Sequence, residues 1–140
     1  MGAILLRMAT GLKSFDNFSW ESLLAGRRTL VCDDLRERAL ACAQALEEAG
    51  ARATLAPAQG LAAERLAGGD FALLVLTLGL DETVSPTLRD AALTKGVAVL
   101  VVAPAALHPR LREDFPAAKL AYPGIGARDL VMLVTGTADE

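Results

Sequence analysis

Apolar residues follow two patterns along this chain: short unbroken runs, and longer stretches in which they recur every three or four positions. The most apolar run is Phe71–Leu80, FALLVLTLGL, which follows Gly-Gly-Asp at 68–70 and precedes Asp81. A run of this length bounded by turn residues is typical of a strand buried on both faces of a parallel sheet. In such sheets the chemistry lies at the carboxyl ends of the strands, so the first position to inspect is Thr77.

Four further apolar runs predict strands, and five stretches with helical spacing lie between and after them. Gly50 is expected to stop the first helix, Ser85 to cap the third with Pro86 at its first position, and His108 to cap the fourth ahead of Pro109. The other strands are expected at Thr29–Cys32, Ala51–Ala56, Val97–Ala103 and Lys119–Tyr122, and the helices at Leu35–Ala49, Gly60–Ala67, Ser85–Lys95, His108–Phe115 and Ala127–Val134.

Strand and helix thus alternate five times, which predicts a parallel sheet with right-handed crossovers and helices on both faces. The 140 residues suit one such domain. Ahead of it, the segment 14–26 predicts a short amphipathic helix with Trp20 on its apolar face. Two interpretations of that helix stay open: a linker packed on the edge of the domain, or a contact with a neighbouring domain or subunit.

Composition and charge narrow the classes of function. The chain is 53% hydrophobic but only 4% aromatic, and its net charge of −3 comes from interspersed charges of both signs. No basic field indicates nucleic acid or an anionic membrane, and no apolar run reaches the roughly 18 residues of a spanning helix. Cys32 and Cys42 lack the spacing of a metal or disulfide site, so we expect reduced, buried thiols in a cytoplasmic protein.

Three features of the sequence resemble the response-regulator receiver family. They are the acidic pair Asp33-Asp34 at the end of the first strand, the strand within Phe71–Leu80, and Tyr122-Pro123, where the family has Lys-Pro with a cis peptide bond. The segment 24–28, LAGRR, also resembles the join between kinase core and receiver in hybrid histidine kinases. The resemblance implies a flavodoxin-like (βα)5 three-layer sandwich with strand order 2-1-3-4-5. It would place an extension or linker at 1–26, the domain at 27–136 and a tail at 137–140.

The same resemblance implies where a phosphorylation site would lie. A working receiver has two carboxylates for Mg²⁺, an aspartate that accepts the phosphoryl group, a hydroxyl on the fourth strand and a lysine before the proline. The acidic pair matches Asp33 and Asp34, but the acceptor position falls on Thr77, the hydroxyl on Val102 and the lysine on Tyr122. Lys119 lies three residues too early to replace that lysine. Catalysis of phosphoryl transfer is positioning and charge neutralisation, so three losses together predict a site that no longer transfers phosphate.

Each of these residues also has an ordinary structural interpretation. Asp33 and Asp34 are expected to cap the following helix, because two carboxylates alone make a poor Mg²⁺ site. We expect no bound metal. Thr77 is expected to be a satisfied hydroxyl at a buried strand end rather than the target of a Ser/Thr kinase. Tyr122 is expected to fill the vacated pocket, with stacking on a planar ligand as the alternative.

These expectations favour a non-enzymatic pseudo-receiver without a cofactor, acting as a protein-interaction module in bacterial two-component signalling. Its partner would be a histidine kinase core or another receiver, met through about residues 103–134. The alternative is a receiver-like domain that binds a cyclic dinucleotide and controls a histidine kinase. A flavin in the flavodoxin manner is disfavoured, because the acidic residues after the first strand would repel its phosphate. The dinucleotide would be bound by Arg110, Arg112, Tyr122 and Arg128, the last of these following the glycine-rich turn at 123–126.

Overall fold

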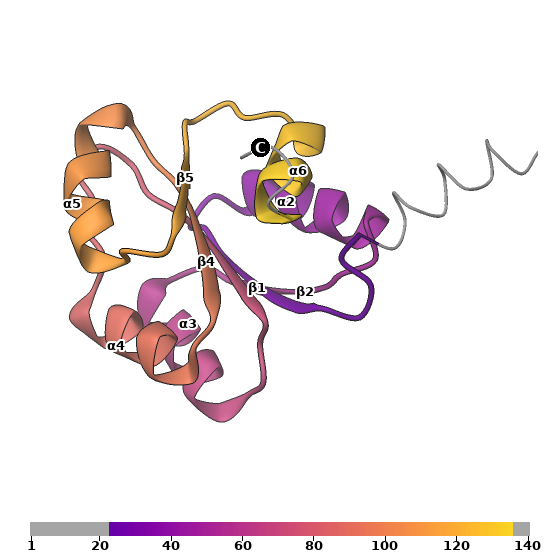
Figure 1. Cartoon of the computed structure of the whole chain (residues 1–140), viewed down its shortest axis with the longest axis horizontal. Helices are drawn as coiled ribbons and strands as arrows, with labels where there is room; N and C mark the ends of the chain where they lie inside the picture. Colours follow the sequence, from indigo (N-terminus) through magenta and orange to yellow (C-terminus); the bar gives the residue numbers. More distant parts are fainter. Residues whose placement is uncertain (1–22, 136–140) are drawn as a thin grey trace, which may run out of the picture.

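Five parallel strands form one sheet in the order β2-β1-β3-β4-β5 (Figure 1). The structure is a computed structural model that describes residues 23–135. The strands are β1 (Arg28–Cys32), β2 (Arg52–Ala56), β3 (Leu73–Thr77), β4 (Ala98–Val102) and β5 (Lys119–Ala121). The helices are α2 (Arg36–Glu48), α3 (Gln59–Gly68), α4 (Pro86–Lys95), the short 3-10 helix η1 (Ala105–Leu107), α5 (His108–Asp114) and α6 (Ala127–Thr135).

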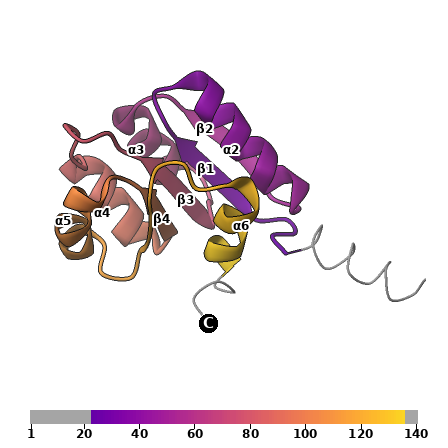
Figure 2. The same cartoon turned by 90° about the horizontal axis from the view of Figure 1, so that it is seen from above.

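Helices cover both faces of the sheet, which gives three layers. Helices α2 and α6 lie side by side on one face, and α3, α4 and α5 lie on the other (Figures 1 and 2). Successive strand residues point to opposite faces. On β1, Val31 therefore packs toward α2 and α6, while Leu30 and Cys32 pack toward the other helices. The two-sided burial explains why β3 and β4 are nearly unbroken apolar runs. The expected flavodoxin-like sandwich and strand order are confirmed.

The central strand β3 is shorter than the apolar run that predicted it. Its pairing with β4 ends at Thr77, opposite Val102, and the chain then leaves the sheet. At Gly79 the backbone N–H donates to the Glu82 carboxylate, 2.5 Å away, in a turn that carries Leu80 outward with 63% of its surface exposed. The predicted end of this strand was therefore wrong, because the last apolar residues of the run belong to a loop.

The predicted helix ends are correct at α4 and wrong at α5. The Ser85 hydroxyl accepts a 3.0 Å hydrogen bond from the Leu88 N–H, Pro86 follows at the first helical position, and Gly96 ends α4 with a φ of 66°. By contrast, His108 is the first residue of α5 and is buried, so it does not cap that helix. The hydrogen bond from the buried imidazole to the Ala103 carbonyl compensates for its loss of contact with water. That is a different role from capping a helix at the surface.

Most of the amphipathic helix predicted over 14–26, Trp20 included, lies outside the described residues, as does the tail at 137–140. Leu24 is described and buried, and its N–H donates to the Ala49 carbonyl at 2.8 Å. Within residues 23–135, no helix has the length and apolar character needed to cross a bilayer.

Candidate functional site

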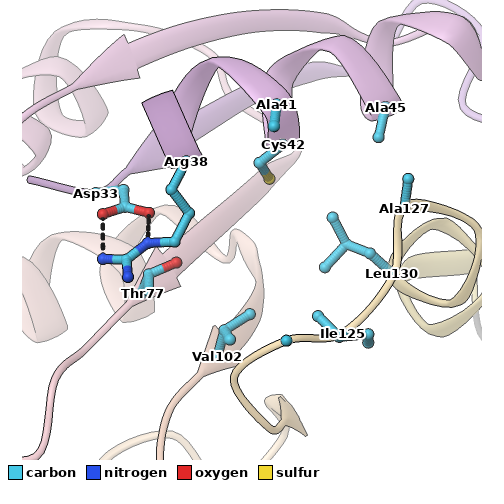
Figure 3. A pocket seen from close by; sticks show the side chains of 11 residues that line it. Asp33, Arg38, Ala41, Cys42, Ala45, Thr77, Val102, Ile125, Ala127 and Leu130 are labelled. Atoms are coloured by element: carbon cyan, nitrogen blue, oxygen red, sulfur yellow. Dashed lines mark hydrogen bonds and ion pairs between the residues drawn. The ribbon is translucent and has the colours of Figure 1, made fainter. Parts of the chain in front are cut away.

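Parallel strand pairing brings three of the predicted site positions to one place. Asp33 follows Cys32, which is opposite Leu76, and Thr77 is opposite Val102. All three line a pocket of about 210 Å³ between α2 and α6, above the ends of β3 and β4 (Figure 3). We call it the α2–α6 pocket. It is completed by Arg38, Ala41, Cys42, Ala45, Gly124, Ile125, Ala127 and Leu130.

The buried Asp33 carboxylate is held by a guanidinium. Arg38 donates from Nε to Oδ2 at 2.6 Å and from one terminal nitrogen to Oδ1 at 2.7 Å, and Oδ1 also accepts the Leu35 N–H at 3.0 Å. The Asp33 side chain is 1% exposed and that of Arg38 is 49% exposed. The hydrogen bond to Asp33 is the main cause that raises the pKa of Arg38. This two-pronged geometry is the strong form of a charge-assisted hydrogen bond.

The expected capping role of the acidic pair is wrong. The residue at the cap position of α2 is Leu35, and no side chain caps that end. Asp33 instead bonds the N–H two residues on, outside the helix, while Asp34 is exposed with its carboxylate 3.7 Å from Arg38. Asp33 therefore stabilises the loop before α2 by accepting hydrogen bonds from Leu35 and Arg38, and Asp34 adds only an exposed ion pair.

Arg38 is a site residue that the sequence analysis did not identify. It follows Asp34 by four positions, which is the spacing of an ion pair on a helix surface, and that spacing could have drawn attention to it. Its stronger partner, Asp33, lies before the helix begins, and helical spacing alone does not reveal that contact. Among the described residues, no group of three or more His, Cys, Asp or Glu side chains could hold a metal ion. A cationic side chain already bonds both oxygens of the carboxylate that would ligate one.

Thr77 and Val102 form the floor of the α2–α6 pocket (Figure 3). Val102 is buried, and Thr77 is half-buried. Within residues 23–135 the Thr77 hydroxyl makes no hydrogen bond to another residue, but it is not a buried atom without a partner, as the Thr29 hydroxyl is, so its expected role as a satisfied hydroxyl stays a prediction. The positions predicted for the acceptor and the hydroxyl thus hold a threonine and an apolar side chain.

Tyr122 does not line the α2–α6 pocket, so the expectation that its side chain fills the site is wrong. Its side chain is 60% exposed and stacks on His108, with ring centroids 4.8 Å apart and planes 18° apart. His108 Nε2 lies 2.9 Å from the Ala103 carbonyl, and a carbonyl only accepts, so Nε2 carries the hydrogen. The described residues contain no cis peptide bond, so Tyr122-Pro123 is trans, unlike the family pattern.

The residues considered for a cyclic dinucleotide are spread over the surface. Arg110, Arg112 and Tyr122 line three different pockets, and Arg128 lies in the first turn of α6. Arg110 also lies 3.8 Å from the Asp114 carboxylate.

Both cysteines are free thiols, but they differ in their surroundings. Cys32 is buried, and burial, followed by the nearby charge of Asp33, raises its pKa to about 12. Cys42 is only half-buried and lines the α2–α6 pocket, where burial raises its pKa to about 11. The expectation of two buried thiols holds fully for Cys32 alone.

Comparison with known proteins gives structural neighbours at low sequence identity. No family model matches the sequence, and no curated protein matches it. A receiver domain protein from Methanospirillum hungatei superposes with a TM-score of 0.68 at 20% identity, covering 82% of this chain and 95% of its own. The chain has the receiver fold. A sensor protein from Polaromonas gives 0.64 at 22% identity, covering 81% and 96%. A Burkholderia pseudomallei response regulator with a phosphorylated aspartic acid and a calcium ion gives 0.68 at 18%, covering 81% and 69%.

Proposed function

We propose that this receiver-fold chain is a non-phosphorylatable pseudo-receiver that regulates a two-component pathway by binding another protein. The observation that carries the proposal is the arrangement at the carboxyl edge of the sheet. Arg38 bonds both oxygens of Asp33, and a threonine stands where a phosphoryl acceptor would be. The module therefore acts without chemistry of its own.

The chemistry of phosphoryl transfer gives the reason. The reaction needs an acceptor carboxylate and cations that neutralise the charge spread over the transferred group. Thr77 offers no carboxylate, Val102 offers no hydroxyl, and Tyr122 has turned away to stack on His108. Mg²⁺ would also have to displace Arg38 from a buried carboxylate. Each of these losses removes an electrostatic contribution to the transition state.

The proposed partner is a histidine kinase core or another receiver. A signalling context is supported by the receiver fold and by its structural neighbours, which include response regulators and a sensor protein. The proposed contact surface comprises α5, β5 and α6. There β5 is an edge strand, and Leu120 and Leu133 line two adjoining surface pockets beside it. The free thiols support a reducing compartment, and we propose the cytoplasm.

The direct test adds acetyl phosphate or beryllofluoride with Mg²⁺ to the isotope-labelled chain and follows its amide NMR spectrum. We expect no change at Asp33, Asp34 or Thr77, because the acceptor is absent and the acidic pair is engaged. An intact receiver treated in parallel is the positive control. Clear, saturable shifts at those three residues would overturn the proposal.

The cyclic-dinucleotide alternative has weaker support. Arg110, Arg112 and Tyr122 line three different pockets, and the α2–α6 pocket is below the range of about 300–1,000 Å³ typical of drug-sized ligands. Calorimetry with cyclic di-GMP tests it: binding heat that disappears in Arg110→Ala or Arg112→Ala would favour this alternative over a purely protein-binding role.

A further inference from the structure

The lining of the α2–α6 pocket suits an uncharged, apolar ligand, unlike the charged phosphorylation site of a working receiver. Its walls are small or apolar side chains from α2, α6 and the loop before α6 (Figure 3). Among the described residues, the charged side chains of the lining are those of Asp33 and Arg38, and they neutralise each other. One polar group stays available on the floor, the hydroxyl of Thr77. This inference depends on the lining and not on the proposed regulatory role.

The pocket stays open because three alanines stand where larger side chains would close it. Ala41 and Ala45 lie one turn apart on α2, and Ala127 begins α6. Farther along the two helices, the larger side chains of Leu46 on α2 and Leu130 on α6 fill the space between them, since both are buried in the same core cluster. The opening is therefore local to the carboxyl edge of the sheet.

Charge and size define the chemical class of the ligand. An anion would meet a carboxylate whose guanidinium is already engaged, and Asp34 lies nearby with a second negative charge. A cavity of about 150 Å³ lined by apolar side chains is enough for benzene, and the α2–α6 pocket measures about 210 Å³. A bicyclic aromatic molecule with one hydroxyl or carbonyl fits both limits.

We propose that the α2–α6 pocket binds a small, neutral, mostly apolar molecule that forms one hydrogen bond with the Thr77 hydroxyl. Its apolar body would contact Leu130, Ile125 and Val102. Such a ligand touches both α2 and α6, so its binding would fix one helix against the other.

The test uses 2-naphthol as the probe, with 2-naphthoate as its anionic analogue. Methyl NMR at neutral pH should show saturable shifts of Leu130, Ile125 and Val102 with the alcohol and at least tenfold weaker binding of the carboxylate. The probe should also slow alkylation of Cys42, which lines the pocket, and leave Cys32 unchanged. Equal binding of both probes, or no saturable shift with 2-naphthol, would overturn the inference.

Matched variants separate pocket binding from adhesion to the surface. Ala127→Leu and Ala41→Leu fill the pocket at exposed helical positions, where leucine is well tolerated. Ala67→Leu makes the same change on α3, across the sheet. Binding should be lost in the first two variants and kept in the third. Thr77→Val should weaken 2-naphthol roughly 2- to 10-fold and leave naphthalene unchanged. Binding that survives both filling variants would refute the site.

The outcome is independent of the beryllofluoride experiment. A chain that binds 2-naphthol in the pocket and also responds to beryllofluoride would keep this inference and lose the proposed function. A chain that does neither would keep the proposed function and lose this inference.

Discussion

Arg38 lies half exposed on α2, yet its two short hydrogen bonds both go to one buried carboxylate. Removing a carboxylate from water is costly unless charged or polar partners replace the water. Arg38 and the Leu35 N–H supply those partners. The guanidinium thus compensates for burying an acidic residue at the end of a strand.

Substitution of Arg38 by alanine tests this role. We expect the free energy of unfolding to fall by about 1–3 kcal/mol, because the buried carboxylate loses its charged partner while water gains only partial access. Arg38→Lys should recover only part of the lost stability, because lysine keeps the positive charge but its ammonium cannot bond both carboxylate oxygens in the same way. Urea unfolding measures both variants.

Arg36→Ala is the control, an exposed arginine on the same helix, and it should change stability by less than about 0.5 kcal/mol. Equal effects of Arg36→Ala and Arg38→Ala would show that the Asp33–Arg38 ion pair contributes nothing specific.

Cys42 gives a pH dependence with a defined sign. Burial raises its pKa to about 11 from an ordinary value of 9.0. Below pH 9 the thiol is neutral in both states, so its contribution to stability is complete. Between pH 9 and 11 the unfolded chain loses the proton first, so stability falls as the pH rises. At pH 10 the loss should be about 1 kcal/mol relative to pH 8.

Because tyrosine and lysine also titrate in this range, the measurement is the difference between the wild type and Cys42→Ala. Urea midpoints at pH 8 and pH 10 should converge for the two proteins as the pH rises. A constant difference across that range would mean that the folded and unfolded thiols ionise alike.

At the scale of elements, the start of α5 and the loop after β5 are joined by the stack of His108 on Tyr122. His108 is fixed from the other side by its hydrogen bond to the Ala103 carbonyl at the end of β4. A short strand and a seven-residue helix are thereby held together at the edge of the sheet.

Tyr122→Ala should lower stability by about 0.5–1.5 kcal/mol, because an aromatic pair is lost beyond simple area burial. Tyr122→Phe keeps the stacked ring and should be close to the wild type. Thermal unfolding compares the three proteins. A loss in the phenylalanine variant as large as in the alanine variant would assign the effect to the hydroxyl and not to the stack.

The elements themselves were largely predictable from the sequence, for physical reasons. Two-sided burial makes β3 and β4 unbroken apolar runs, and Ser85-Pro86 and Gly96 mark the ends of α4 by local backbone chemistry. The errors fall where tertiary contacts decide. The apolar run continues past Gly79 to Leu80, although the chain has already left β3 there, and the burial of His108 depends on β4 and Tyr122.

At the scale of the whole molecule, parallel pairing made part of the site predictable. Once the strand order was inferred, Asp33, Thr77 and Val102 had to meet at one edge, and they line one pocket. The direction of Tyr122 and the contact of Arg38 were not predictable in this way. Both depend on side-chain rotamers and on neighbours from other elements, which periodicity does not encode.

The receiver frame predicts what restoring phosphorylation would require. Thr77→Asp supplies an acceptor carboxylate, but Arg38 would still bond Asp33. Val102 and Tyr122 would still stand where a working receiver has its hydroxyl and its lysine. We therefore expect little phosphorylation of Thr77→Asp by acetyl phosphate and Mg²⁺.

Adding Arg38→Ala, Val102→Thr and Tyr122→Lys frees the carboxylate and restores both groups, so this combination should accept a phosphoryl group in a Mg²⁺-dependent reaction. Intact-mass spectrometry measures the added mass. If the single variant is phosphorylated as fully as the combined one, then Arg38 is no barrier, and Thr77 alone prevents phosphorylation.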